Sequence, residues 1–419
     1  MKIIILLSMG FLLTRADQVL KNYQDGNIKF TSDVYRELSK SASGNILMCP
    51  LSVEIVLAMV FSGAKGETAK QLSLATHLPN DQEEVVEMFS ELIPQLESSD
   101  KYTFESANKI YVQNTYKVQE QYNDIVVNKF KSEIESIDFV SPNAASNMNE
   151  WVEKKTHNKI TNLINQDDLD EDSRLMIVNA MYFKGQWVKG FKESSTEPKP
   201  FFLNSTHYID TDMMSNKGSY KYYEDTELKA KFLEIPYKGN DVSMIIALPD
   251  NPEDINTLEN NMDIVLKPKF EHLVNINIRI PKFEIKESIK FKKILQSLGA
   301  VLPFEDGANF DVMIPTGTFA EPLKIAEIVQ KAVIEVDEKG TVAAASSAAH
   351  MQTWRSGKIF PDTYFYADHP FIFFIKHKTF GVTFIGRYCE PKGIIQTGKY
   401  EAPVDSYFKN LKVQIPTDI

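Results

Sequence analysis

The residues best suited to chemistry lie together in one stretch of the second half of the chain. Residues 341–349 are nine small or β-branched side chains without charge or proline, and Gly340 precedes them. A polar segment follows, in which Trp354, Arg355 and Ser356 are consecutive. Arginine in an exposed loop is what the acidic pocket of a trypsin-like protease binds. The stretch therefore has the chemistry of a protease substrate.

The same stretch is able to form a β-strand between two other strands. Small uncharged side chains can lie there on both faces without burying an unpaired charge. Because residues 341–349 contain no proline, every amide can donate to a ladder, and Gly340 gives the backbone freedom to turn. A flexible linker or a short alanine helix is the alternative for such a run in isolation. Strand patterns flank it, however, and a long loop within a compact domain is usually functional.

The elements that must position this stretch follow from hydrophobic periodicity. Residues 30–38 and 81–96 carry apolar side chains at helical spacing, and a third helix follows Pro142. Residues 175–183 are almost continuously apolar, as expected for a strand covered on both faces, and residues 325–336 form a long strand that leads to Gly340. Helices come mainly first and strands mainly later, so we predict an α+β fold.

Composition and the amino terminus predict a secreted protein. Residues 1–16 combine Lys2, an apolar run and small residues near Ala16, which is the layout of a signal peptide, and we expect cleavage after Ala16. The run is too short for a transmembrane anchor. The net charge of −11 disfavours nucleic acid and anionic membranes as partners. Asn204-Ser205-Thr206 is an acceptor sequence for N-linked sugar, which we expect to be used.

Several classes of site are not indicated. Cys49 and Cys389 lie in very different settings, so we favour two unpaired thiols over a disulfide. The seven histidines are scattered and no CxxC pair is present, so neither a zinc site nor another cofactor is expected. No GxSxG, HExxH or phosphate-loop motif occurs, and we predict that the chain is not an enzyme.

Several motifs, in order along the chain, resemble the serpin family. Residues 45–72 resemble its early helix-and-turn block, residues 179–187 its best-known strand motif, residues 323–336 the strand before the hinge, and His369-Pro370-Phe371 with Gly386-Arg387 its closing strands. The similarity covers roughly residues 25–392. The residues similar to the family's hinge are Glu338, Lys339, Gly340, Thr341, Val342, Ala343, Ala344 and Ala345.

The resemblance implies one monomeric serpin domain over residues 17–392, with three β-sheets, eight or nine helices and an exposed reactive-centre loop at about 338–361. Residues 393–419 would be an extension of unknown role. The resemblance also implies a region that opens the central sheet, made of Cys49, Ser52, Asn179, Trp187 and Gln330. Family members commonly have serine where Cys49 stands and histidine where Gln330 stands. Glutamine still donates and accepts hydrogen bonds, so we expect that the central sheet can still open but that the stability of the protein is altered.

The activity implied by the resemblance is suicide inhibition of a serine protease. The protease would cleave the loop, remain bound as an acyl-enzyme and be trapped when the loop enters the central sheet. Arg355-Ser356 would suit a trypsin-like enzyme, whereas Trp354-Arg355 would suit a chymotrypsin-like one, and the sequence leaves both open. Cysteine proteases are a further possible target. The alternative is a serpin-fold carrier, hormone precursor or chaperone that inhibits nothing, although such members tend to carry charge, proline or bulk in the hinge.

Overall fold

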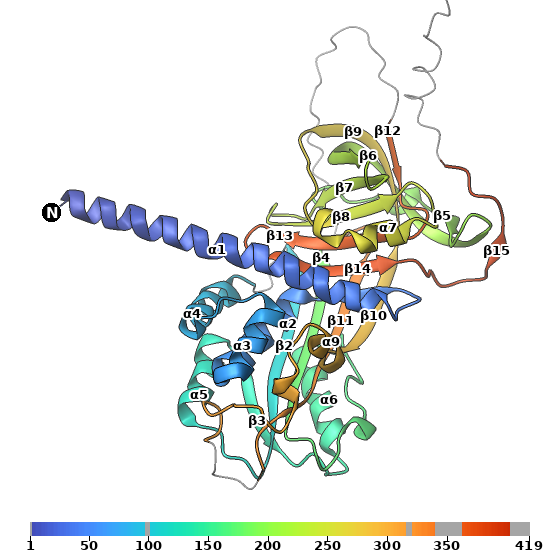
Figure 1. Cartoon of the computed structure of the whole chain (residues 1–419). Helices are drawn as coiled ribbons and strands as arrows, with labels where there is room; N and C mark the ends of the chain where they lie inside the picture. Colours follow the sequence, from blue (N-terminus) through green and yellow to red (C-terminus); the bar gives the residue numbers. More distant parts are fainter. Residues whose placement is uncertain (1, 97–100, 316–320, 340–362, 403–419) are drawn as a thin grey trace, which may run out of the picture. The chain divides into compact units, whose positions relative to one another are not determined.

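The computed structural model describes residues 2–96, 101–315, 321–339 and 363–402, with side chains from residue 18 onward (Figure 1). The chain forms two compact units that interleave along the sequence. Unit 1 holds residues 1–183, 285–334 and 374–386, and unit 2 holds residues 184–284, 335–373 and 387–419. The single domain expected over residues 17–392 stays a prediction.

Unit 1 contains a five-stranded sheet in the order β10-β11-β4-β2-β3. The strands that form this sheet are β2 (Tyr102–Gln113), β3 (Glu133–Ile137), β4 (Leu175–Gly185), β10 (Phe283–Lys290) and β11 (Ile325–Val336). The helices of this unit are α1 (Lys2–Ser39), α2 (Pro50–Gly63), α3 (Gly66–Thr76), α4 (Gln82–Leu92), α5 (Glu120–Asp124), α6 (Ala144–Lys155) and α9 (Lys292–Ser297). The predicted early helices and the strands at residues 175–183 and 325–336 are thus confirmed.

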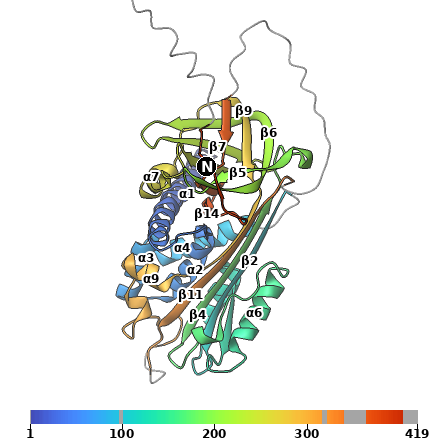
Figure 2. The same cartoon turned by 90° about the vertical axis from the view of Figure 1, so that its right-hand side faces the viewer.

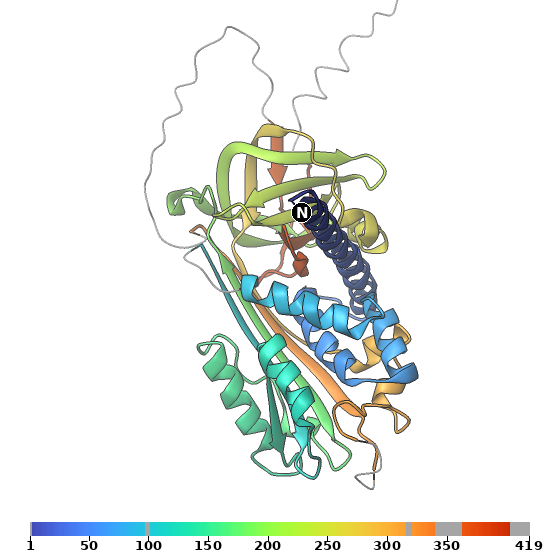
Figure 3. The ribbon, with the colours of Figure 1, turned by 90° about the vertical axis from the view of Figure 1, so that its left-hand side faces the viewer.

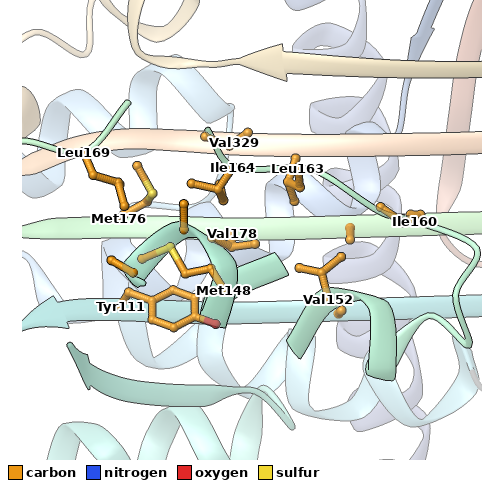
Figure 4. Packing of buried hydrophobic residues seen from close by; sticks show 14 of the residues in the cluster. Tyr111, Met148, Val152, Ile160, Leu163, Ile164, Leu169, Met176, Val178 and Val329 are labelled. Carbon is orange, nitrogen blue, oxygen red and sulfur yellow. The ribbon is translucent and has the colours of Figure 1, made fainter. Parts of the chain in front are cut away.

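Helices cover both faces of this sheet. Figures 2 and 3 show α6 on one face, with α2, α3 and α4 on the other. Helix α2 is almost wholly apolar, and each of its residues is buried, as expected for a helix without an exposed polar face. On the opposite face, Met148 and Val152 of α6 belong to one buried hydrophobic cluster with Val178 of β4 and Val329 of β11 (Figure 4).

Unit 2 is built on antiparallel pairing around one long strand. Its strands run β8-β7-β6-β9-β12, and β5 and β15 also pair with β6. The elements are β5 (Thr196–Phe202), β6 (His207–Asp225), β7 (Ala230–Pro236), β8 (Val242–Pro249), α7 (Ile255–Asn260), α8 (Met262–Val265), β9 (Leu273–Pro281), β12 (Thr363–Tyr366) and β15 (Gln396–Thr397). Strands β13 (Phe371–His377) and β14 (Gly381–Tyr388) each contribute residues to both units, and β1 (Ile46–Met48) is the neighbour of β14.

The length of β6 explains how the described strands group into sheets. Strand β6 has nineteen residues and pairs in turn with β5, β9 and β7. Because one strand belongs to successive ladders, hydrogen bonding joins strands that would otherwise count as separate sheets. The described strands therefore form two connected sheets where the resemblance implied three, and the α+β class is confirmed.

Candidate functional site

The predicted reactive stretch falls largely outside the described residues. Trp354, Arg355 and Ser356 lie outside them, as do hinge residues 340–345. The structure describes the chain up to Lys339, three residues after β11 ends, and again from Thr363, where β12 begins. Strand β11 belongs to the five-stranded sheet, whereas β12 pairs parallel to β9 in unit 2. The site is therefore built from the strands that lead into and out of the stretch.

Strands β11 and β4 are direct parallel neighbours. Their register runs from Ile325 opposite Leu175 to Ile334 opposite Phe183, with an irregularity near Ile325. Both strands carry nearly continuous apolar runs because helices cover both faces of the sheet. The ladder places Gln330 directly opposite Asn179. Two polar side chains are thus paired in the middle of an apolar sheet.

Gln330 ties these two strands to the start of α2. Its Oε1 accepts a hydrogen bond from the backbone N–H of Cys49 at 2.9 Å, and its Nε2 donates to the Cys49 carbonyl at 2.9 Å. The same Nε2 donates to Asn179 Oδ1 at 2.7 Å. All three residues are fully buried. A primary amide is suited to this position because it pairs with a backbone N–H and C=O at once.

Asn179 extends the same network across the sheet. Its Nδ2 donates to Ser52 Oγ in the first turn of α2 and to Asn108 Oδ1 on β2. We call Cys49, Ser52, Asn108, Asn179 and Gln330 the sheet clamp. Four of them are residues singled out from the sequence, whereas Asn108 was missed. A polar residue within an alternating strand is a weak signal, and only the pairing of β2 with β4 brings Asn108 to the network.

The Cys49 thiol is not a reactive group. Burial raises the pKa of Cys49 well above its ordinary value, so the thiol stays protonated and cannot act as a nucleophile. Cys389 is partly buried, and burial raises the pKa of its thiol too. Neither cysteine forms a disulfide, which confirms the prediction of two unpaired thiols.

A buried carboxyl group, which the sequence did not reveal, lies beside the clamp. Glu54 follows Ser52 in α2 and is fully buried. Its Oε2 accepts hydrogen bonds from Tyr23 Oη at 3.0 Å and Asn27 Nδ2 at 2.9 Å, while its Oε1 has no partner. Burial raises the pKa of Glu54 from 4.5 to about 8. The neutral acid is therefore the favoured form in the folded protein.

Trp187 belongs to unit 2 and hydrogen-bonds the chain just after β11. Its ring stacks on Tyr237 with a centroid distance of 4.2 Å and an interplanar angle of 13°. Its Nε1 donates to the carbonyl of Asp337 at 2.9 Å. Lys184 bridges Glu335 at 2.8 Å and Asp337 at 2.9 Å. Aromatic packing and ion pairs thus fix the last described residues before the hinge.

Glu338 is an anchored member of the predicted hinge. Its carboxylate lies 3.0 Å from Lys282 Nζ, and its carbonyl accepts a hydrogen bond from the N–H of Phe191 at 2.9 Å. Burial opposes ionisation, but hydrogen bonds from its own backbone N–H and from Lys282 outweigh it and lower the pKa of Glu338. By contrast, the pair between Lys339 and Glu193 is largely exposed and contributes little to stability.

The predicted sugar acceptor lies in a turn between β5 and β6. Asn204 Oδ1 accepts hydrogen bonds from the N–H of Thr206 at 2.9 Å and from Thr206 Oγ1 at 3.0 Å. The first residues of the extension pair with this turn, because the N–H of Tyr400 donates to the Ser205 carbonyl and that of Gly398 to the Thr206 carbonyl, both at 2.9 Å. The extension thus begins as a docked segment.

The described part of the chain contains neither a metal-binding cluster nor a membrane-spanning helix. Among residues 2–96, 101–315, 321–339 and 363–402, no three His, Cys, Asp or Glu side chains are grouped so that they could hold a metal ion. No helix in the described part of the chain is both long and apolar enough to cross a membrane.

Comparison with known proteins places the chain in one family. The family model described as Serpin (serine protease inhibitor) matches residues 25–391. Serpin B4 of Homo sapiens is 32% identical over 396 residues, covering 89% of this chain and all of that protein. Leukocyte elastase inhibitor of Homo sapiens is 33% identical over 386 residues, with the same coverage. The crystal structure of Serpin48, a highly specific serpin of the insect Tenebrio molitor, matches with a TM-score of 0.80 at 32% identity, over 89% of this chain and 99% of that one. The chain therefore belongs to the serpin family.

Proposed function

We propose that this serpin is a secreted suicide inhibitor of serine endopeptidases. The protease would cleave the loop after Arg355, or after Trp354, and remain bound as an acyl-enzyme while the loop enters the sheet between β11 and β4. The observation that carries this proposal is the direct parallel pairing of β11 with β4, with an uncharged, proline-free run following β11 in the chain. The names of relatives such as leukocyte elastase inhibitor support it.

The direction of the two strands favours insertion between them. A segment that turns back after β11 runs antiparallel to both β11 and β4, because these two strands are parallel to each other. One parallel ladder would be replaced by two antiparallel ladders, which are slightly more stable per residue. Serpin loop insertion is itself a known example of strand addition of this kind.

The free energy released would be large enough to distort a bound enzyme. The β11–β4 register runs from Ile325 to Ile334, so the net gain is about one ladder of that length. About ten hydrogen bonds at roughly 1 kcal/mol each would give on the order of 10 kcal/mol. That is comparable to the stability of a typical domain. Inserting residues 340–354 at about 3.3 Å each would carry the protease on the order of 50 Å.

Trapping depends on bond formation at the reactive carbonyl. The serine Oγ of the protease attacks the carbonyl of Arg355 or Trp354, and the new amino terminus leaves with a proton from the protease's general base. Insertion that outpaces hydrolysis leaves the ester bond intact. The serpin is then a substrate whose turnover stops at the acyl-enzyme, and its own side chains catalyse nothing.

Incubation with trypsin and with chymotrypsin tests the proposal. We expect that at least one of them forms a complex that survives boiling in SDS. We also expect a released carboxyl-terminal fragment whose mass shows that it starts at Ser356 or Arg355. A fragment that begins at Ser356 assigns the trypsin-like specificity. Clean cleavage by both enzymes without any complex would refute inhibition and favour a carrier or chaperone of the same fold.

Secretion and glycosylation form a separate part of the proposal. The signal-like residues 1–16 and the turn that contains Asn204 support them. We expect the protein expressed in eukaryotic secretory cells to start at Asp17 and to lose mass on treatment with an N-glycosidase. An Asn204→Gln variant should show no such loss, and retention of residues 1–16 on the mature protein would contradict secretion by this route.

A further inference from the structure

The described part of the carboxyl-terminal extension is fastened to unit 2 by both backbone and aromatic contacts. Strand β15 of the extension pairs with the start of β6. The ring of Tyr400 packs edge-on against Phe202, with ring centroids 5.1 Å apart, and against His369, at 5.3 Å. The backbone N–H of Tyr400 donates to the β5–β6 turn. Tyr400 therefore joins the extension both to this turn and to the segment that follows β12.

His369 is a buried histidine whose two ring nitrogens both face oxygen atoms. Its exposed fraction is 2%. Nε2 lies 2.7 Å from the carbonyl oxygen of Pro249, and because a carbonyl can only accept, this nitrogen carries a proton. Nδ1 lies 2.9 Å from Asp368 Oδ1 and 3.3 Å from the Tyr400 hydroxyl. The protonation of Nδ1 therefore decides which of these two neighbours it can bond.

The two neighbours of Nδ1 need opposite forms of the ring. Burial raises the pKa of Tyr400, so its hydroxyl keeps its proton and can donate to the bare Nδ1 of a neutral ring. An ionised Asp368 has no proton to donate and can only accept one from a protonated Nδ1. A charge-assisted bond to a carboxylate is stronger than one to a hydroxyl. A protonated ring therefore bonds Asp368 and no longer accepts from Tyr400.

Three other titratable side chains lie around this pair. Glu253, between β8 and α7, interacts electrostatically with His369, and Asp250 in the same connection interacts with Tyr400. His207 of β6 pairs with the extension at β15. Histidine is the side chain whose charge ordinarily changes between pH 5 and 8, whereas carboxyl groups ordinarily ionise below this range. A test of pH dependence must therefore separate His369 from His207.

We propose that His369 and Tyr400 form a pH-sensitive latch, which holds the extension on unit 2 while His369 is neutral and loosens when His369 takes up a proton. Because the docked state favours the neutral ring, docking is strongest near pH 8 and weakens as the pH falls. Loosening uncovers Phe202 and the β5–β6 turn and frees the docked residues for other contacts. The latch lies wholly in unit 2 and does not depend on the proposed inhibitory function.

Hydrogen exchange of the extension in the full-length protein tests the latch. The N–H groups of Gly398 and Tyr400 donate to the carbonyls of Thr206 and Ser205, both at 2.9 Å, so their protection reports docking. Exchange of peptides that contain these amides is measured by mass spectrometry at about pH 5 and about pH 8, and each rate is divided by the intrinsic rate at that pH. Loss of one hydrogen bond of typical net strength should make the protection about fivefold lower at the acid pH.

Two matched variants separate the latch from other sources of pH dependence. Tyr400→Phe keeps the aromatic ring but removes the hydroxyl, so we expect low protection at both pH values and no dependence on pH. Tyr208→Phe removes a different hydroxyl contact with the extension, the bond from Tyr208 Oη to Gln396 Oε1 at 3.0 Å, which involves no histidine. We expect this control to lower protection at both pH values and to keep the pH dependence of wild type.

Each outcome of this experiment bears on the latch. Equal protection of wild type at the two pH values, or higher protection at the acid pH, would refute it. Tyr400→Phe that keeps the pH dependence would assign that dependence to His207 or another group and would refute it too. Complex formation with trypsin and chymotrypsin is measured on the same samples, so the latch and the proposed function can each fail alone.

Discussion

Replacing Gln330 by alanine should destabilise the uncleaved serpin more than the cleaved form. In the uncleaved sheet, the substitution leaves two buried groups without their partner, the Cys49 N–H and Asn179 Oδ1. The Cys49 carbonyl keeps its hydrogen bond from the N–H of Val53 at 3.3 Å. In the proposed mechanism, the inserted loop would form a new strand between β11 and β4, so Gln330 could no longer reach Asn179. Only the Cys49 N–H then loses a partner through the substitution.

The size of the effect follows from these two groups. An unsatisfied buried polar group costs about 1–3 kcal/mol, so the uncleaved form should lose roughly 3 kcal/mol. An unfolding entropy of about 2.1 cal/mol/K per residue gives on the order of 0.85 kcal/mol/K for a chain of this length. The melting temperature of the uncleaved form should therefore fall by about 4 °C. The free energy lost by the cleaved form should be about half as large.

Thermal melting of the uncleaved protein and guanidinium unfolding of the protease-nicked protein measure the two losses. Lys331→Ala is the matched control, because Lys331 is the next residue on β11 and donates to the Thr161 carbonyl at 2.7 Å rather than to β4 or α2. We expect this control to shift the melting temperature by less than half as much. A Gln330→Ala protein that melts within 1 °C of wild type would show that the clamp does not hold the uncleaved sheet.

Three further predictions address other parts of the molecule. Burial raises the pKa of Glu54 from 4.5 to about 8, so the stability that the neutral acid contributes is complete below pH 4.5 and is lost as pH rises through 8, at about 1.4 kcal/mol per pH unit between these values. Glu54→Gln should therefore flatten the plot of melting temperature against pH in this range, and an unchanged slope would contradict the assignment. Thr341→Arg should bury a charge on insertion and so convert the inhibitor into a substrate that is cleaved without being trapped; full trapping efficiency, read on an SDS gel, would show that the hinge is misassigned. Truncation after Lys392 removes the docked residues 393–402 and their two backbone hydrogen bonds to the β5–β6 turn. The melting temperature should fall by a few degrees, while complex formation with trypsin persists. Equal melting temperatures would mean that the docked segment adds no stability.

The parts of the fold that local pattern could predict are those where one periodicity dominates. Helix α2 and strand β4 are almost wholly apolar, so their burial follows directly from composition. Strand β6 is different. Residues 215–219, Ser-Asn-Lys-Gly-Ser, have the composition of a turn, yet they continue the strand because β9 supplies ladder partners, with Asn216 opposite Ile278 and Gly218 opposite Ile276. Partners supplied from elsewhere in the chain cannot be read from a local window.

The candidate site likewise depends on contacts between residues far apart in the sequence, which local patterns do not reveal. Gln330 and Asn179 were found through family resemblance, because nothing local indicates that residues so far apart in sequence are direct neighbours on adjacent strands. Asn108 and Glu54 were missed. Such polar side chains are recognised by their partners: those of the buried Glu54 lie on α1, and those of the half-buried Asn108 include Ser52 of α2 and Asn179 of β4. Long-range register therefore decides the chemistry of this site.

The estimated free energies of the clamp and of the inserted ladder indicate which step of the proposed mechanism the sheet clamp can control. Insertion would break the contact of Gln330 with Asn179 but not that with Cys49, so it would cost about half of the roughly 3 kcal/mol that Gln330→Ala removes from the uncleaved form, whereas a complete inserted ladder would supply on the order of 10 kcal/mol. In the proposed mechanism, the clamp would be too weak to prevent insertion after cleavage of the loop, but the contact between Gln330 and Asn179 would have to open before inserted residues could pair at that level. Its effect should therefore fall on the rate of insertion. In the proposed mechanism, trapping is a competition between insertion and hydrolysis of the acyl-enzyme, so an amide at position 330 that binds both Cys49 and Asn179 would help to set the fraction of encounters that end in inhibition.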